Sequence, residues 1–180
     1  LRRGAHLHGQ ARRHEDHHAG TSKHARVLTD KMGQEAQMLS RLRHKHLVEV
    51  YDAGHDEHGQ IWMVMERLVG SDLEAVLRRD GKLGLERALR SAEAVASATA
   101  VVHQAGVIHR DLKPGNIHVS ETHVVTVIDF GTARFRQGAT LQGQTVGTIP
   151  YMSPEHLRGA ELDGRTDVFA LGMVLWEMLG

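Results

Sequence analysis

The chain has 180 residues, of which 41% are hydrophobic, so it is long enough to form one domain with a buried core. Lysine plus arginine and aspartate plus glutamate number 22 each, so the charge gives no general argument for binding nucleic acid or membranes. The absence of cysteine excludes disulfides, a thiol nucleophile and a cysteine-bound zinc site, and we expect a reducing, cytoplasmic compartment.

Residues 1–26 differ from the rest of the chain. They are rich in histidine and arginine, contain almost no large apolar residues and show neither helical nor strand periodicity. No cysteine or carboxylate completes a recognised metal-ligand spacing with these histidines, so a solvated tail is favoured over a metal site. The segment has no apolar centre and is not a secretory signal, and no apolar run in the chain is long enough to span a bilayer.

Regular patterning begins at Val27. Residues 34–43 carry apolar side chains at helical spacing and predict a helix. Two short apolar runs follow, at residues 47–51 and 61–65, separated by the polar, glycine-containing residues 54–59. This arrangement predicts a β-hairpin.

Two helices are predicted next. Residues 71–79 form the first, in which Ser71 and Glu74 have the spacing of a capping box. Residues 85–104 form a long, alanine-rich second helix, which Gly106 is expected to terminate.

The last part of the chain alternates short strands with loops. Strand-like runs occur at residues 107–108, 117–119 and 124–128, followed by a glycine- and threonine-rich loop at 131–148. Residues 163–180 are an apolar helix. The order of elements predicts an α+β fold with two unequal lobes and a cleft between them.

Three segments carry residue types suited to phosphoryl transfer: residues 109–116 (His-Arg-Asp-Leu-Lys-Pro-Gly-Asn), 129–131 (Asp-Phe-Gly) and 147–155 (Gly-Thr-Ile-Pro-Tyr-Met-Ser-Pro-Glu). Asp111 can orient a hydroxyl and accept its proton. Lys113 can place positive charge near a transferred phosphate. Asn116 and Asp129 offer the oxygen ligands that Mg²⁺ prefers, and the strands between them would bring them together.

These segments resemble the catalytic loop, the metal-binding turn and the activation-segment end of protein kinases, in the family's order and spacing. Residues 151–155 and 166–172 are most similar to bacterial members of the eukaryotic-type serine/threonine class. The resemblance implies ATP and Mg²⁺ as cofactors and a protein Ser/Thr hydroxyl as substrate. It implies catalytic roles for Asp111, Lys113, Asn116 and Thr148, and metal binding by Asn116 and Asp129.

The resemblance extends over about residues 27–180. It implies a small-lobe remnant at 27–65, a hinge at 66–70 and part of the large lobe at 71–180. By this resemblance, Glu35 would be the αC glutamate, with a solvated surface carboxylate as the alternative, and Leu39, His109 and Phe130 would form a spine of stacked side chains. Around the adenine, Met65 would be the gatekeeper, Glu66 and Leu68 would make backbone contacts, and His118 would lie under the base. Asp167 would brace the catalytic loop from beneath.

Asp72 allows two interpretations. The resemblance places it within reach of the ribose, whereas its position at a helix start equally favours a carboxylate interacting with the helix dipole.

Some features depart from the family pattern. No Gly-x-Gly-x-x-Gly segment precedes Glu35, and Arg26 stands at the position of the family's nucleotide-binding lysine, where arginine does not reproduce the ammonium geometry. The chain ends in a helix that matches αF, so the partner expected for Glu155 is absent.

We therefore predict a serine/threonine protein kinase whose activity is impaired in this chain. The alternative is a pseudokinase-like binding or scaffolding module, and a small-molecule phosphotransferase is a more distant third. Kinases in which an arginine precedes the catalytic aspartate, as Arg110 precedes Asp111, are commonly ordered by a phosphate on the activation segment. The resemblance therefore also implies phosphorylation at Thr140 or Thr145.

Overall fold

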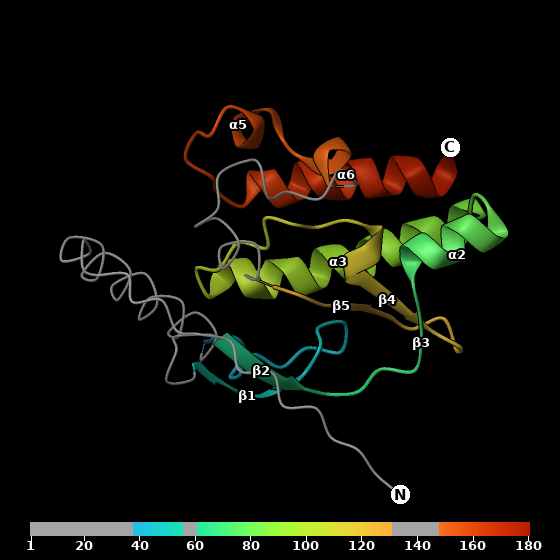
Figure 1. Cartoon of the computed structure of the whole chain (residues 1–180). Helices are drawn as coiled ribbons and strands as arrows, with labels where there is room; N and C mark the ends of the chain where they lie inside the picture. Colours follow the sequence, from blue (N-terminus) through green and yellow to red (C-terminus); the bar gives the residue numbers. More distant parts are fainter. Residues whose placement is uncertain (1–37, 56–60, 131–147) are drawn as a thin grey trace, which may run out of the picture.

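The computed structural model describes residues 38–55, 61–130 and 148–180. Figure 1 shows the arrangement of the elements. In chain order they are β1 (Val50–His55), β2 (Ile61–Met65), β3 (Gly70–Asp72), α2 (Leu73–Asp80), α3 (Leu85–Gln104), η1 (Pro114–Asn116), β4 (Ile117–Ser120), β5 (Val125–Val127), η3 (Ile149–Tyr151), α5 (Pro154–Leu157) and α6 (Arg165–Leu179).

Strands β1 and β2 form the predicted antiparallel hairpin, with a register shift between Val50 and Asp52. Strand β1 begins later than predicted and continues to His55, into the segment expected to turn. The continuation is explained by Gly54, which pairs with Trp62: a Cβ atom there would lie 2.7 Å from Trp62 Cζ2, so the indole lies over the glycine.

A second antiparallel sheet has the strand order β3-β4-β5. Ser71 pairs with Val119, and Val119 pairs in turn with Val125. Long helix α3 packs against β5 and against α6. All three residues of β5 are buried, because the strand lies in the interior beside this helix. The predicted strand at residues 107–108 is absent, and these residues run irregularly into the catalytic segment.

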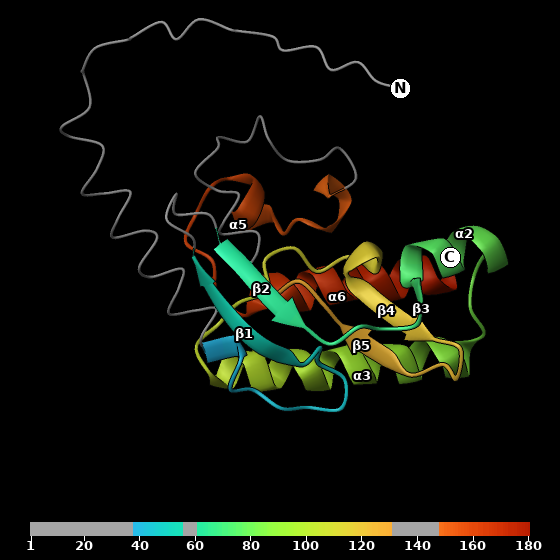
Figure 2. The same ribbon diagram turned by 60° about the horizontal axis from the view of Figure 1, so that its bottom comes forward.

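The main core lies where α2, α3, α6 and the second sheet meet. Its fully buried side chains include Leu73, Ile117, Val174 and Met178. Small residues of α3, among them Ala88 and Ala98, allow its neighbours to approach closely. The loop before α3 is also joined to the end of α6, because Leu83 N donates to Met178 O at 2.6 Å. Figure 2 accordingly shows the C-terminus beside α2.

Helix α3 has the predicted bounds, and Gly106 follows its end with a φ of 76°, a conformation that favours glycine. The predicted capping box of α2 is wrong. Ser71 belongs to strand β3 and pairs with Val119, so the helix starts two residues later than predicted. Asp72 is the N-cap residue, and its Oδ1 accepts a hydrogen bond from Ala75 N at 2.6 Å. Glu74 instead forms an ion pair with Arg78.

The hairpin is attached to the larger part of the molecule through the residues just before β1. Val48 N donates to Val127 O at 3.0 Å, and Val127 N donates to His46 O at 2.9 Å. Leu39 and Leu47 belong to the main core. Of the helix predicted at residues 34–43, only the end lies in the described ranges, with helical structure at 38–39. The predicted α+β fold of two unequal parts is confirmed.

Among the described helices, none is both long enough and apolar enough to cross a membrane.

Candidate active site

Asp167, in the first turn of α6, holds the backbone of the catalytic segment. Its side chain is fully buried, and its two oxygens accept hydrogen bonds from the backbone N–H groups of His109 and Arg110, each at 2.8 Å. His103, near the end of α3, approaches Asp167 Oδ2 at 2.7 Å. Arg110 has a φ of 67°, a conformation that non-glycine residues rarely adopt, so the buried carboxylate stabilises a strained turn. The predicted bracing contact is present.

His109 links this turn to the strand that leads to Asp129. It is completely buried, and burial lowers its pKa despite the nearby Asp167 carboxylate, so the ring is neutral. Ile128 O can only accept, so His109 Nε2 donates to it at 3.1 Å, while Nδ1 accepts from Asp111 N at 3.4 Å. The ring also packs against Phe130 in a tilted arrangement, with centroids 4.5 Å apart and ring planes at 46°.

Four residues predicted to be catalytic form one connected cluster. Asp111 Oδ2 accepts from Lys113 Nζ at 3.0 Å and from Asn116 Nδ2 at 3.1 Å. Lys113 Nζ also donates to Thr148 Oγ1 at 2.8 Å, although Thr148 is 35 residues further along the chain. The lysine therefore joins the end of the activation segment to the carboxylate of the catalytic loop.

A backbone hydrogen bond connects the residue before Asp129 to this cluster: Ile128 N donates to Asn116 O at 3.0 Å. The Asp129 φ of 60° is a strained conformation of the kind that occurs at functional sites. Asp129 also lines a small apolar cavity under the hairpin, together with Leu39, Leu47, Val48, Val50, Met63, Met65 and Phe130.

The donor chemistry fits Mg²⁺. The amide nitrogen of Asn116 faces Asp111 and donates to both its backbone and side-chain oxygens, so Oδ1 is the Asn116 atom suited to a cation. Together with the Asp129 carboxylate it would supply two oxygen ligands. Within the described ranges, no group of three or more His, Cys, Asp or Glu side chains is arranged to hold a metal. Two protein oxygens suit Mg²⁺, which usually takes its remaining ligands from water and phosphate.

The predicted hinge follows β2. Glu66 is fixed against the residue before β1: its N–H donates to Glu49 O at 2.9 Å, and its side chain accepts from Glu49 N at 2.8 Å. Met65 is partly exposed at the edge of the small cavity, and Leu68 is partly buried. The role of these residues as a hinge and their contacts with a nucleotide both stay predictions.

Asp72 and His118 lie opposite each other in the β3–β4 register. The Asp72 carboxylate acts as a helix cap, which was one of its two predicted roles, and a ribose contact stays a prediction. His118 Nε2 is buried without a hydrogen-bond partner in the described part of the chain. The predicted site residues Arg26 and Glu35, and the phosphorylation candidates at 140 and 145, lie outside the described residues.

Two contacts at the site were not predicted. His103 was not singled out, although a histidine in the last turn of an alanine-rich helix is the signal that could have identified it. The Tyr151 hydroxyl donates to Glu177 Oε2, and burial together with this carboxylate raises the pKa of Tyr151. This bond joins η3, just after Thr148, to α6.

Glu155 has hydrogen-bonding neighbours within the described residues. Its Oε1 accepts from Thr166 Oγ1 at 3.1 Å, and Thr166 in turn contacts the Ser153 hydroxyl at 2.8 Å. Its own backbone N–H and the Ser153 hydroxyl lower the pKa of Glu155, so the carboxylate is stabilised in its charged form.

Comparison with known proteins agrees with this geometry. Residues 13–180 match the family described as "Protein kinase domain". The chain is 40% identical over 156 residues to serine/threonine-protein kinase pkn3 of Myxococcus xanthus, covering 81% of this chain and 28% of that protein. It is 41% identical over 152 residues to serine/threonine-protein kinase PknB of Mycobacterium leprae, covering 81% of this chain and 24% of that protein.

Among solved structures, a crystal structure of Rad53 1-466 in complex with AMP-PNP is similar, with a TM-score of 0.68 and 26% identity. The likeness covers 83% of this chain and 38% of that chain. The chain thus spans about a quarter of the length of the curated relatives named above.

Proposed function

The chain belongs to the protein kinase family, and from this premise we propose that it carries the catalytic centre of a serine/threonine protein kinase. Its reaction would transfer the γ-phosphoryl group of ATP to a serine or threonine hydroxyl of a protein. The observation that carries the proposal is the cluster of Asp111, Lys113, Asn116 and Thr148, in which the lysine contacts both the carboxylate and the threonine.

In this proposal Asp111 orients the substrate hydroxyl and accepts its proton. Lys113 and Asn116 both hold Oδ2, so the hydroxyl would be received at Oδ1. Lys113 would also stabilise negative charge on the transferred group, because its ammonium is largely shielded from water, where electrostatic interactions are stronger. Bound at Asn116 and Asp129, Mg²⁺ would neutralise the phosphate oxygens.

The nucleotide would lie between the hinge and β4. Glu66 and Leu68 would present backbone groups to the base, Met65 would border it and His118 would lie beneath it. The Asp72 cap uses only Oδ1, so Oδ2 could still accept a ribose hydroxyl. The similar Rad53 structure is a complex with AMP-PNP, which supports a nucleotide site for this fold.

We expect slow transfer by this chain on its own. No Gly-x-Gly-x-x-Gly segment precedes Glu35, and Arg26 stands at the position of the nucleotide-binding lysine. Loss of one preorganised electrostatic group typically lowers the rate by about 10²–10³. A pseudokinase-like module, the alternative, would bind nucleotide or partners without any transfer that depends on Asp111.

The test is a phosphate-transfer assay on the purified chain with Mg²⁺-ATP and a basic protein substrate. Asp111→Asn should lower the residual rate by about 10²–10⁴, because it removes the proton acceptor but keeps the side-chain shape. Asp163→Asn, at an exposed ion pair on the surface, is the matched control and should leave the rate unchanged. If both variants transfer phosphate as fast as the original chain, the assigned role of Asp111 is wrong.

Nucleotide binding, measured separately by titration with a fluorescent ATP analogue, distinguishes the alternatives. Tight binding with no detectable transfer by any variant would favour the pseudokinase-like module.

A further inference from the structure

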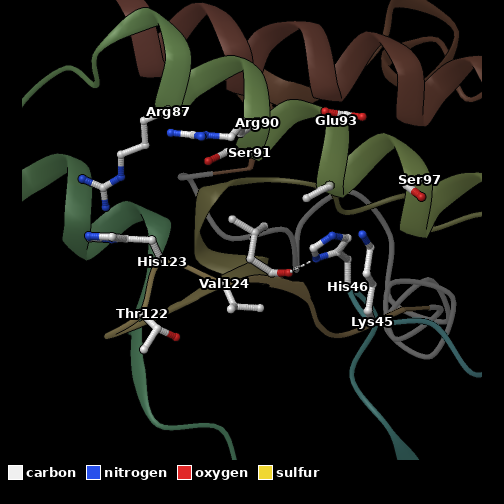
Figure 3. Close-up of a pocket in the computed structure, with 12 residues that line it drawn as sticks. Lys45, His46, Arg87, Arg90, Ser91, Glu93, Ser97, Thr122, His123 and Val124 are labelled. Atoms are coloured by element: carbon white, nitrogen blue, oxygen red, sulfur yellow. Dashed lines mark hydrogen bonds between the residues drawn. The ribbon is translucent and has the colours of Figure 1, made fainter.

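A cavity of about 590 Å³ lies away from the catalytic cluster, between α3, the loop before β1 and the β4–β5 turn (Figure 3). It shares no residue with the catalytic cluster or the hinge. Its volume is in the range of sites that bind small molecules or a few residues of a peptide. The lining residues that matter here are Lys45, His46, Arg87, Arg90, Glu93 and His123.

The lining is predominantly basic. Lys45, Arg87 and Arg90 are permanent cations, whereas Glu93 is the one acidic residue among the lining residues. Arg87 and Arg90 come from adjacent positions on the same side of α3, three residues apart. Figure 3 shows both side chains extending toward the end of the cavity where His123 lies.

Among the described residues, the carboxylates near the two arginines engage them only weakly. Arg87 Nη1 lies 3.9 Å from Asp80 Oδ2, but that carboxylate is already held by two bonds from Arg79, at 2.6 and 3.0 Å. Arg90 pairs with Glu86 at 3.2 Å, and both side chains are largely exposed, so water screens the pair. A guanidinium has five N–H donors, so each arginine retains donors for an incoming anion.

The other end of the cavity is suited to a peptide. The His46 ring must donate through Nδ1 to Val125 O, at 2.8 Å, because a carbonyl only accepts. Its Nε2 atom is left as the second polar site of the ring, beside Lys45. The hydroxyl groups of Ser91 and Thr122 and the apolar side chain of Val124 also line the cavity, so it offers both hydrogen-bonding and apolar contacts.

We propose that this cavity binds a phosphorylated segment of a protein, with the phosphate held by Arg87, Arg90 and His123 and the adjoining residues extending toward Lys45. A phosphate dianion suits two adjacent guanidinium groups better than a carboxylate does, because it offers three acceptor oxygens and more charge. The chain as a whole is neutral and Glu93 limits the basic surface, so the cavity favours a short anionic segment over a long nucleic acid.

The proposal does not depend on phosphate transfer by this chain, so its test is a binding measurement made without nucleotide or Mg²⁺. The probe is a fluorescent peptide carrying one phosphoserine, compared by anisotropy with the same peptide carrying serine. The phosphorylated form should bind at least ten times more tightly. The double variant Arg87→Gln/Arg90→Gln should abolish that difference.

Two further variants and one control sharpen the test. Arg87→Lys/Arg90→Lys keeps the charge but loses the planar fork, and should leave an intermediate preference. Thr122→Glu adds a negative charge at the rim without altering either arginine, and should also weaken binding severalfold. Arg158→Gln removes an exposed arginine that lines none of the cavities described above, and should change nothing.

Equal affinity for both peptides would overturn the proposal. The proposal would also be overturned if both Arg87→Gln/Arg90→Gln and Thr122→Glu kept the original preference for the phosphorylated peptide. This conclusion requires that the thermal unfolding midpoints of both variants match that of the original chain. Tighter binding of a single-stranded oligonucleotide, lost in the same double variant, would assign the cavity to nucleic acid and equally reject the phosphopeptide.

Discussion

The hairpin and the larger part of the molecule, residues 70–130 and 148–180, are stabilised very differently. Within the hairpin, Val50 and Ala53 are buried in a small cluster of their own, with Met63 packed against them. Tyr51, Trp62 and Val64 are largely exposed. The larger part has a continuous core that runs through α2, α3, α6 and the second sheet.

This difference bears directly on function, because the catalytic cluster belongs entirely to the larger part. Asp111, Lys113 and Asn116 follow a turn that Asp167 holds from the buried face of α6. The hairpin supplies one wall of the small cavity beside Asp129. Under the proposed function, the catalytic geometry would depend on the core of the larger part, whereas the hairpin would mainly shape the space available to a nucleotide.

Removing the Asp167 carboxylate should have the largest effect on stability. Asp167→Asn replaces an oxygen that accepts from a backbone N–H with an amide that cannot accept, leaving a buried donor unpaired. Breaking such a buried charged network typically costs about 3–5 kcal/mol. Urea unfolding followed by circular dichroism measures the loss, and Asp52→Asn on the exposed hairpin should shift the unfolding free energy by less than about 0.5 kcal/mol. Equal effects of the two variants would mean that the two parts are not stabilised differently.

A matched pair of apolar truncations compares the two parts directly. Met178→Ala removes a side chain that is 1% exposed in the main core and should cost about 2–5 kcal/mol. Val64→Ala removes a side chain that is 50% exposed on β2 and should cost less than about 0.5 kcal/mol. The same urea titration gives both values. A Val64 effect as large as that of Met178 would show that the hairpin contributes to a core of its own.

Acid should destabilise the larger part through its buried histidines. Burial lowers the pKa of His109 below the ordinary 6.5, so between these two values the unfolded chain binds more protons than the folded one. The stabilising contribution is therefore complete above pH 6.5 and is lost as the pH falls toward the folded pKa. The slope from this one group is at most about 1.4 kcal/mol per pH unit. Urea midpoints measured from pH 7.5 to 5 test it.

His109→Phe keeps an aromatic ring beside Phe130 and should reduce that slope. Burial also lowers the pKa of His44 and His156, so part of the slope should persist. Asp163, whose pKa is lowered to about 2 chiefly by its hydrogen bonds with Arg165, loses its charge only below 3.8 and does not affect this window. An unchanged slope in the variant would contradict the assignment of a neutral, buried His109.

The smallest expected effect lies at the junction between the two parts. Asp72→Ala removes the cap of α2 and should cost about 1 kcal/mol. Ser71→Ala, one residue earlier in β3, should cost less than about 0.5 kcal/mol, because Ser71 does not cap the helix. Thermal unfolding of the two variants, measured side by side, compares their losses of stability. If Ser71→Ala lowered the stability more than Asp72→Ala, the capping box predicted from the sequence would be correct.

The sequence alone predicted best those structural features that a local sequence pattern or a known motif determines. The bounds of α3 follow from its periodicity and the glycine after it. The resemblance of their segments to known motifs placed Lys113 and Thr148 in the same predicted site, and the structure shows the two side chains in contact. These features depend on residues close in sequence or on spacing that recurs across a family.

Other features depend on tertiary contacts that local pattern does not encode. The start of α2 was misplaced because Ser71 pairs with Val119, which lies 48 residues later. The contact of His103 with Asp167 joins two helices through residues that are 64 positions apart in the sequence. The basic cavity was not anticipated at all, because its wall combines Arg87 and Arg90 with residues from two distant loops.

The Asp167 network also has a consequence for hydrogen exchange. His109 and Arg110 lie outside every helix and strand, yet their amide hydrogens are bonded to a carboxylate with no access to solvent. Loop amides usually exchange with deuterium through small local openings, whereas these two can exchange only when α6 separates from the catalytic segment. Their protection should therefore match that of the core helices, and it would report on whether the catalytic segment opens independently of the rest of the molecule.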